Sequence, residues 1–413
     1  MAAVSILRSK LEAYVSSTNK ALDFKLVRNE VDVHSDKASF KPEFTHQIFG
    51  DNESVFGYRD LSIQLYYTSA SLHPYLGMNY SEKIDPSKYD GVEADVILPK
   101  IAEKLQPGFA TNLDEFILSI TSKNSKFKPY GEKLHEFTNL DPENMKRIYE
   151  IYKCDITTAG FKNYFERLQT FVLWYIDAAS FIDVDDEKWK FYLVYEKYKD
   201  CENQRFAIAG FCTVYHYYAY PNLTRPRISQ MLVLPPFQRR GIGAELLQTI
   251  CTMYVADPEV LDITVEDPSE EFVRLRDYLD SKNCLKLKSF KTECLRDGFS
   301  EEMATEAQMK LKLNKKQSRR IYEILRLRIT DTGNCGQYRS YRLDIKNRLN
   351  LPFQKQQSDL MKLQKTLRPE ELKATLNYTN KEQRIEQLER QYQELETDYR
   401  RVLDRLAMSK LSS

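Results

Sequence analysis

The pattern of apolar and polar positions is clearest in the middle of the chain, at residues 228–254. Residues 228–234 are apolar and partly β-branched, and two prolines end the run, which predicts a strand. A turn with two glycines follows at 238–244. Good helix formers continue from Ala244, and the apolar positions at helical spacing are Leu247, Ile250, Cys251 and Tyr254. We therefore predict a strand, a turn and a helix in succession.

Similar patterns predict further elements on both sides of this unit. Residues 162–179 indicate an amphipathic helix, whose apolar face consists of Phe165, Leu168, Phe171, Val172, Tyr175 and Ile176. Strands are predicted at 189–195 and 206–218, joined as an antiparallel hairpin by a polar turn. A strand at 261–267 and a helix capped by Ser269 follow. The order from residue 162 is helix, three strands, loop, helix, strand, helix.

The N-terminal part of the chain mixes both periodicities. Strands are predicted at 61–67 and 71–80, and helices at 4–15, 97–105 and 113–122. This combination indicates an α+β domain.

The C-terminal part, beyond residue 299, is helical in pattern and is punctuated by Gly333 and Pro352. At 385–406 apolar residues recur at intervals of three and four, which indicates a short coiled coil or a helix docked elsewhere. The run at 310–320 is strongly basic. It is either a nuclear-import signal, a surface for polyanions, or the solvated face of a helical bundle.

Composition narrows the class of protein. A chain of 413 residues with 42% hydrophobic residues can form sizeable cores. A net charge of +1 gives no overall attraction to nucleic acid or to a membrane. The seven cysteines form no Cys-x-x-Cys pair, so we expect reduced thiols and no metal site. With no secretory or membrane-spanning segment expected, the sequence predicts a soluble intracellular protein.

The turn at 238–244 predicts a phosphate site, because a helix N-terminus presents backbone N–H groups and a positive dipole end. A Walker loop requires Lys-Ser/Thr after the second glycine, and a dinucleotide fingerprint requires glycine at 246, which is leucine. The remaining pattern, Gln/Arg-x-x-Gly-x-Gly/Ala, resembles the pyrophosphate loop of the GCN5-related (GNAT) N-acetyltransferases. The order of elements from residue 162 resembles the GNAT core as well.

This resemblance implies acetyl-CoA as co-substrate. Backbone groups of Met231, Leu232 and Val233 can pair with the pantetheine arm, as an added strand would. The N–H groups of the turn can hold the pyrophosphate, and two arginines add positive charge. The predicted turn residues are Gln238, Arg239, Arg240, Gly241, Ile242, Gly243 and Ala244.

Acetyl transfer to a lysine also requires removal of a proton, because the amine has a pKa near ~10.4 and is almost entirely charged at pH 7. A carboxylate near the thioester is the natural base. Glu266 and Asp267, at the end of the strand after the cofactor helix, are the first candidates, and Asp177 is another. A covalent acetyl-cysteine route is disfavoured, because no cysteine has a neighbouring histidine in the sequence.

Longer motifs narrow the resemblance to one family. Residues 180–189, 215–218, 225–234, 261–269, 338–346 and 49–53 are similar to the type B histone acetyltransferase catalytic subunits. That family acetylates free, newly made histones, chiefly the tail of histone H4 and less so histone H2A, in the nucleus and cytoplasm. It works with a WD-repeat histone chaperone. The resemblance therefore implies those partners and locations, with no direct binding of nucleic acid and no membrane.

The resemblance also implies residue roles. Glu266 is the proposed general base with Asp267 beside it, and Asp177 stands where the family usually has glutamate. Ser269 aligns with a position that touches the cofactor. The positions that match tail-binding residues are Asp51, Asn52, Glu53, Trp189, Tyr215, His216 and Tyr217. A lysine-rich peptide favours such carboxylates and aromatic faces.

The predicted fold class is α+β / α/β, with a mixed, mostly antiparallel GNAT sheet and flanking helices. The expected domains are an N-terminal α+β domain at 1–135 on the histone-tail side, the catalytic domain at 136–298, a helical domain at 299–350 and a helical tail at 351–413. Two alternatives stay open. One is a GNAT enzyme for a small molecule or a protein N-terminus, which a substrate panel would separate. The other is a non-catalytic scaffold, which would not bind acetyl-CoA.

Overall fold

The computed structural model describes residues 11–89, 91–141, 143–201, 203–363 and 381–411. The chain divides into two compact units, described separately below. The first unit contains residues 1–218 and 226–250, and the second contains 219–225 and 251–413. No helix among the described residues is long and apolar enough to cross a membrane.

The N-terminal part of the first unit is built on a four-stranded sheet with strand order β3-β2-β6-β7. Its strands are β2 (Leu22–Val27), β3 (Ser39–Phe40), β6 (Ser62–Thr68) and β7 (Pro74–Asn79). Strands β2 and β6 run parallel, whereas β3 and β7 pair antiparallel with their neighbours. Helix α6 (Leu113–Ser125) packs on this sheet through a core of Val27, Val33, Tyr66, Tyr75, Phe116 and Ile120.

Shorter elements complete this part of the first unit. Two small antiparallel sheets pair β1 (Val15–Ser17) with β4 (Ser54–Phe56) and β5 (Tyr58–Arg59) with β8 (Glu82–Lys83). The short helices are α2 (Thr18–Ala21), α3 (Glu30–His34), α4 (His46–Phe49) and α5 (Leu98–Ala102).

A second, larger sheet follows in the same unit, with consecutive strands in the order β13-β12-β11-β10-β9. These strands are β9 (Glu132–Leu140), β10 (Lys146–Cys154), β11 (Trp189–Asp200), β12 (Asn203–Ala219) and β13 (Leu223–Val233). The pairs from β9 to β12 are antiparallel, and Trp189 of β11 lies opposite Tyr215 of β12. Helix α9 (Ile242–Ala256) begins after β13.

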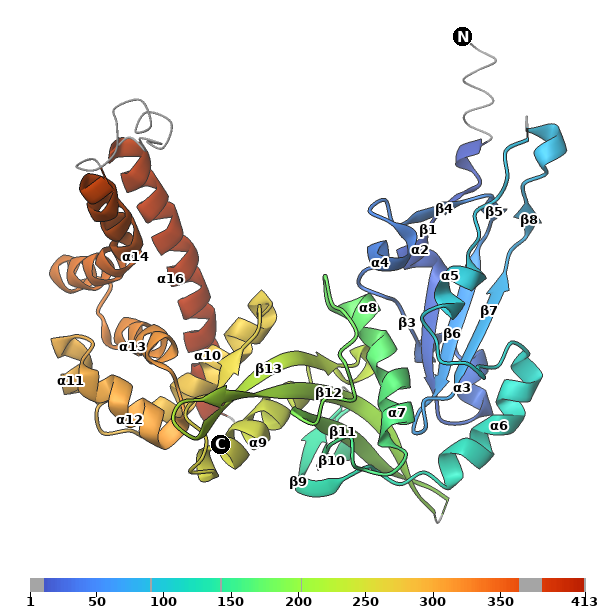
Figure 1. Ribbon diagram of the computed structural model, residues 1–413, viewed down its shortest axis with the longest axis horizontal. Coiled ribbons are helices and arrows are strands. Elements are labelled where there is room, and N and C mark those ends of the chain that lie inside the picture. Colours follow the sequence, from blue (N-terminus) through green and yellow to red (C-terminus); the bar gives the residue numbers. More distant parts are fainter. Residues whose placement is uncertain (1–10, 90, 142, 202, 364–380, 412–413) are drawn as a thin grey trace, which may run out of the picture. The chain divides into compact units, whose positions relative to one another are not determined.

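A helical segment packs between the two sheets of the first unit. It consists of α7 (Phe161–Leu168), a 3₁₀ turn (Gln169–Phe171) and α8 (Val172–Tyr175). Phe165 contacts Phe191 of β11 at a ring distance of 4.5 Å, and Phe171 contacts Tyr67 of β6 at 4.7 Å. The segment is therefore buried on both sides, between the blue N-terminal sheet and the green strands β11 and β12 (Figure 1).

The second unit is mainly helical. Its helices are α10 (Glu270–Cys284), α11 (Thr292–Asp297), α12 (Glu301–Leu311), α13 (Lys315–Ile329), α14 (Cys335–Leu363) and α16 (Lys381–Leu411), with a short strand β14 (Thr264–Val265). Helix α13 contacts all the other helices in this list. Its Glu323 is fully buried and accepts hydrogen bonds from Arg319, Arg348 and Tyr399. A carboxylate can be buried in this way because several donors satisfy its charge.

The structure confirms the predicted strand, turn and helix at 228–254, the hairpin of β11 and β12, and the Ser269 cap, whose oxygen accepts from Phe272 N at 3.3 Å. The helix predicted at 162–179 is wrong at its end, because Ile176 is extended and Ala178 has a φ of 53°. The strand predicted at 261–267 shortens to β14. The hairpin of β9 and β10 was not predicted.

The predictions for the two ends of the chain and for the domain boundaries have mixed outcomes. Residues 4–10 of the predicted N-terminal helix lie outside the described residues, and Val15 begins strand β1 rather than continuing a helix. Pro352 does not end a helix, because α14 continues through it. The predicted boundary at 135/136 falls inside β9, and the one at 350/351 falls inside α14. The heptad residues lie on α16, which docks on α10, α13 and α14.

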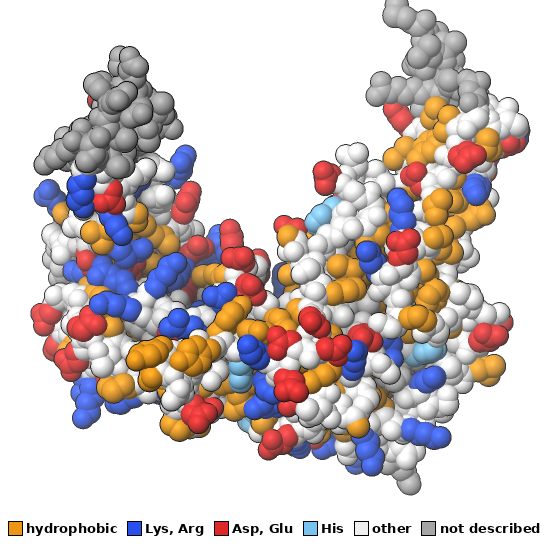
Figure 2. All heavy atoms as spheres, viewed as in Figure 1, with side chains coloured by type: hydrophobic (Ala, Val, Ile, Leu, Met, Phe, Trp, Pro, Cys, Tyr) orange, Lys and Arg blue, Asp and Glu red, His pale blue; other side chains and the backbone are white. Residues whose placement is uncertain are grey.

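The basic run at 310–320 is largely paired within the second unit. Lys310 pairs with Glu306, Lys315 with Glu301, and Arg320 with the buried Asp277. Figure 2 shows Lys and Arg side chains, with Asp and Glu among them, over the helical region that contains α12 and α13. These contacts favour the interpretation as a face of the helical bundle.

Asp280 on α10 gives a pH test of this packing. Burial raises its pKa from 3.8 to about 6, and Arg276 opposes the shift. The folded state therefore binds this proton more tightly than the unfolded state, so the stability from this group is complete below pH ~4 and is lost as pH rises through about 6. We predict that Asp280→Asn increases the melting temperature relative to wild type at pH 7.5 but not at pH 4, by the equivalent of about 1–3 kcal/mol.

Thermal unfolding between pH 4 and 7.5 measures this difference. Asp404→Asn, the same change at an exposed position of α16, is the control and should leave the pH dependence unchanged. Parallel stability curves for wild type and Asp280→Asn would show that the buried carboxyl does not titrate in this range.

Candidate cofactor and catalytic site

The end of β13 is held close to β12 by the absence of a side chain at Gly210. A Cβ atom at Gly210 would lie 2.7 Å from the carbonyl oxygen of Leu232. Leu234 N also donates to Ala209 O at 2.9 Å. Leu232 is buried, while Met231 and Val233 are half-buried on the other face of the strand. Strand β13 therefore ends in a fixed position, at the segment predicted to contact pantetheine.

The turn after β13 reverses the chain into α9 through two left-handed residues. Arg239 has a φ of 60° and Gly241 a φ of 77°. The side chain of Gln238 reaches back and donates to Val233 O at 2.9 Å. Helix α9 begins at Ile242, and the backbone N–H groups of Ala244 and Glu245 in its first turn donate to the carbonyl oxygen of Gly241. The N–H groups that precede them have no carbonyl one turn earlier in the helix to bond to. With Arg239 and Arg240 beside them, these groups suit a pyrophosphate.

Asn139 of β9 makes a side-chain hydrogen bond to this turn. Its Nδ2 atom donates to the carbonyl oxygen of Arg240 at 2.6 Å. A Cβ atom at Gly241 would lie 3.3 Å from the same nitrogen. A side chain at Gly241 would therefore press on the contact that fixes the turn. The sequence did not indicate Asn139, because it lies on a strand that was not predicted.

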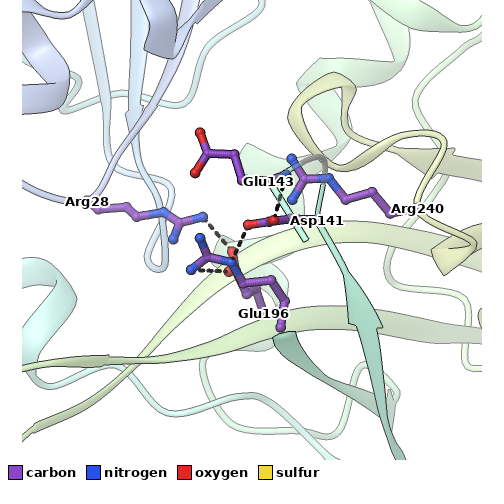
Figure 3. Close-up of a pocket in the computed structure, with 6 residues that line it drawn as sticks. Arg28, Asp141, Glu143, Glu196 and Arg240 are labelled. Atoms are coloured by element: carbon purple, nitrogen blue, oxygen red, sulfur yellow. Dashed lines mark hydrogen bonds and ion pairs between the residues drawn. The ribbon is translucent and has the colours of Figure 1, made fainter. Parts of the chain in front are cut away.

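A polar pocket of about 280 Å³ lies next to this turn (Figure 3). It is lined by Arg28, Asp141, Glu143, Arg147, Glu196 and Arg240. Glu196, whose side chain is only 2% exposed, pairs with Arg28 at 2.5 Å and with Arg147 at 3.8 Å. Asp141 accepts from Arg147 at 2.8 Å. Three arginines and three carboxylates line the pocket, so its formal charges balance.

Asp177 lies in the turn that follows α8. Its side chain is 71% exposed, and its Oδ1 atom lies 3.1 Å from Nε2 of His46. Of the acidic turn 51–53, Asp51 and Asn52 are exposed. Glu53 accepts hydrogen bonds from Thr45 N at 2.6 Å and from Asn19 at 2.6 Å. The pKa of Glu53 is lowered mainly by the hydrogen bond from the backbone N–H of Thr45.

The predicted aromatic residues form one cluster on β11 and β12. The rings of Trp189 and Tyr215 are 4.9 Å apart, and those of Tyr215 and Tyr217 are 4.7 Å apart. The Tyr215 hydroxyl donates to Asp186 at 2.9 Å, and this hydrogen bond raises the pKa of Tyr215. Arg227 lies over the Tyr217 ring at 4.8 Å. His216 points to the opposite face, because side chains alternate along a strand.

The remaining predicted residues belong to the second unit. Glu266 and Asp267 are exposed directly after β14, and Asp267 has a φ of 30°. Ser269 is the N-cap of α10. The strand is anchored by the buried Asp262, which accepts two hydrogen bonds from Arg225, and by a parallel bridge between Thr224 and Val260. The predicted catalytic carboxylates are thus divided, with Asp177 in the first unit and Glu266 and Asp267 in the second.

Comparison with known proteins covers nearly the whole chain. Three family models match: "Histone acetyl transferase HAT1 N-terminus" at 14–177, "Acetyltransferase (GNAT) family" at 145–272, and "Histone acetyltransferase type B catalytic subunit, C-terminal" at 276–327. The human histone acetyltransferase type B catalytic subunit is 50% identical over 404 residues, which cover 98% of this chain and 96% of the human one.

The chain belongs to the family of type B histone acetyltransferase catalytic subunits. The rat protein of the same name is also 50% identical, with the same coverage. A type B catalytic subunit of Dictyostelium discoideum is 36% identical over 331 residues, which cover 78% of this chain and 70% of that protein.

This type B catalytic subunit is therefore a GNAT acyltransferase whose co-substrate is acetyl-CoA. The donors at the start of α9 and the fixed end of β13 fit that molecule. No group of His, Cys, Asp or Glu that could hold a metal ion occurs within the described ranges.

The turn at Gly241 provides a test of the cofactor site. We predict that Gly241→Ala raises the Kd for acetyl-CoA about tenfold, because a Cβ atom strains the left-handed backbone and presses on Asn139. Isothermal titration calorimetry with acetyl-CoA measures the change.

Gly108→Ala is the matched control, since Gly108 has a φ of 90° and open space around its missing Cβ. It introduces similar backbone strain away from the turn and should leave the Kd unchanged. An unaltered Kd in Gly241→Ala would contradict the assignment of this turn to the cofactor.

Proposed function

We propose that this acetyltransferase transfers acetyl from acetyl-CoA to lysine ε-amines in the N-terminal tail of free, newly synthesised histone H4, and less so of histone H2A. The observation that carries the proposal is the left-handed turn at Arg239 and Gly241, which connects the end of β13 to the N-terminus of α9. The 50% identity to the human type B catalytic subunit supports histones as the substrate class.

The proposed mechanism is direct attack of the amine on the thioester in a ternary complex. Acetyl-CoA supplies an activated acyl group with a thiolate leaving group. Glu266 is the proposed general base, with Asp267 beside it and Asp177 as a third carboxylate. A base is required because the lysine amine, with a pKa near ~10.4, is overwhelmingly protonated at neutral pH. Met231, Leu232, Val233 and Ser269 are proposed to contact the cofactor along with the turn 238–244.

The proposed tail site combines aromatic and acidic side chains. The cluster of Trp189, Tyr215 and Tyr217 offers ring faces and edges, and Asp186 adds a carboxylate whose pKa is lowered mainly by the backbone N–H of Lys188. Both features favour a lysine-rich peptide. Asp51, Asn52, Glu53 and His216 complete the proposed substrate residues.

The assembly and location of the enzyme are proposed by analogy with its family. We propose a WD-repeat histone chaperone as the partner subunit and a distribution between nucleus and cytoplasm. The domain assignment follows the same reasoning, with an N-terminal domain on the histone-tail side of the catalytic domain and a helical C-terminal region.

We predict that Glu266→Gln lowers kcat on a histone H4 tail peptide about 10²- to 10⁴-fold at pH 7, the range expected for loss of a general base. The rate of the variant should rise about tenfold per pH unit up to pH ~9, because the neutral fraction of lysine rises in that proportion. Initial rates with saturating acetyl-CoA measure both effects.

Glu270→Gln, at an exposed carboxylate four residues away, is the control and should retain wild-type kcat and pH dependence. Full activity of Glu266→Gln at pH 7 would remove Glu266 from the role of base.

A further inference from the structure

The turn that carries Asp177 is held by side chains from two distant parts of the first unit. Gln47 Nε2 donates to Ala179 O at 2.9 Å, and Gln230 Nε2 donates to Ser180 O at 2.9 Å. Gln47 belongs to α4, whereas Gln230 is on β13, directly before the segment assigned to the cofactor. Backbone bonds from Glu43 and Phe44 to Trp174 O add a further link to the end of α8.

The carboxylate of Asp177 itself meets His46. The distance from His46 Nε2 to Asp177 Oδ1 is 3.1 Å, and the opposite ring nitrogen, Nδ1, lies 3.6 Å from Glu53 Oε1. The histidine side chain is 28% exposed, so the ring is partly shielded between the two carboxylates. The Phe44 ring contacts it edge-on at 5.7 Å.

The carboxylate of Glu53 is in turn anchored by hydrogen bonds from three groups. Its Oε1 atom accepts from the backbone N–H groups of Thr45 at 2.6 Å and His46 at 3.2 Å. Its Oε2 atom accepts from Asn19 at 2.6 Å. The chain of contacts thus runs from a fixed carboxylate, through the imidazole, to the exposed carboxylate of Asp177.

We propose that His46 is a positioning residue for Asp177 in the acetyl-transfer reaction. Aspartate is one methylene shorter than glutamate, so its carboxylate has fewer rotamers and depends more on the turn that carries it. The Nε2 atom of His46 lies 3.1 Å from that carboxylate, while Gln47 and Gln230 donate hydrogen bonds to the backbone after it. This inference rests on the proposed participation of Asp177 and adds a residue of the N-terminal part to the reaction.

A double-mutant cycle tests the proposal, with rates on a histone H4 tail peptide. We expect His46→Ala to lower kcat about tenfold and to leave both KM values within twofold of wild type. His46→Gln, whose amide nitrogen can replace Nε2, should recover kcat to within threefold of wild type. In an Asp177→Asn background, His46→Ala should lower kcat less than twofold further.

His34→Ala, at an exposed histidine of α3, is the control and should have wild-type kinetics. An equal loss of kcat from His46→Ala in both backgrounds would indicate a general structural role and would overturn the proposal, as would wild-type kcat in His46→Ala.

Nuclear magnetic resonance separates this inference from the proposed function. The imidazole ¹⁵N signals of His46 should shift in Asp177→Asn and stay in place in Asp183→Asn, an exposed acidic position in the following loop. A wild-type enzyme inactive on the tail peptide would refute the proposed substrate, whereas unchanged imidazole signals in Asp177→Asn would refute the pairing itself.

Discussion

The structure of the first unit depends on the burial of one helical segment between two sheets. Phe165 packs on Phe191 on one side, and Phe171 and Trp174 pack on Tyr67 and Phe24 on the other. Each fully buried aromatic side chain contributes on the order of 3–5 kcal/mol, as judged from truncation to alanine. Because the segment cannot shift without losing contacts on both sides, the turn after Tyr175 occupies a defined place. The N-terminal sheet is thus packed, through this segment, into the same unit that contains the turn at 238–244.

The cofactor turn is fixed by a different means, namely backbone conformation and hydrogen bonding. Two left-handed residues set the direction in which α9 begins, and Asn139 holds the carbonyl oxygen between them. The pocket beside the turn is lined by equal numbers of arginines and carboxylates, and Arg28 and Arg147 pair with Glu196 and Asp141 there. Preorganised donors of this kind are effective because they require little reorganisation when the charge arrives.

The sequence predicted those parts whose local pattern agrees with their tertiary environment. The apolar run at 228–234, the prolines and the two glycines identify the cofactor unit without any distant contact. Strand β9 was not predicted because it lies at the edge of the sheet, where most of its residues are exposed and polar and show no regular alternation with apolar ones. The pairing of His46 with Asp177 was not predictable either, since it joins positions 131 residues apart that neither periodicity nor spacing relates. Pro352 was expected to interrupt the helical pattern, but a long helix that packs on its neighbours can include one proline.

The central claim is that the turn at 238–244 holds acetyl-CoA while Glu266 takes a proton from a bound lysine. A crystal structure with acetyl-CoA, or an inert analogue, and a histone H4 tail peptide tests it most directly. The account predicts that a Glu266 carboxylate oxygen lies about 3 Å from the lysine Nζ atom, or about 5 Å away with one bridging water, and that the pyrophosphate contacts the N–H groups of the turn. A Glu266 carboxylate more than about 8 Å from that nitrogen, with no connecting water, would contradict it.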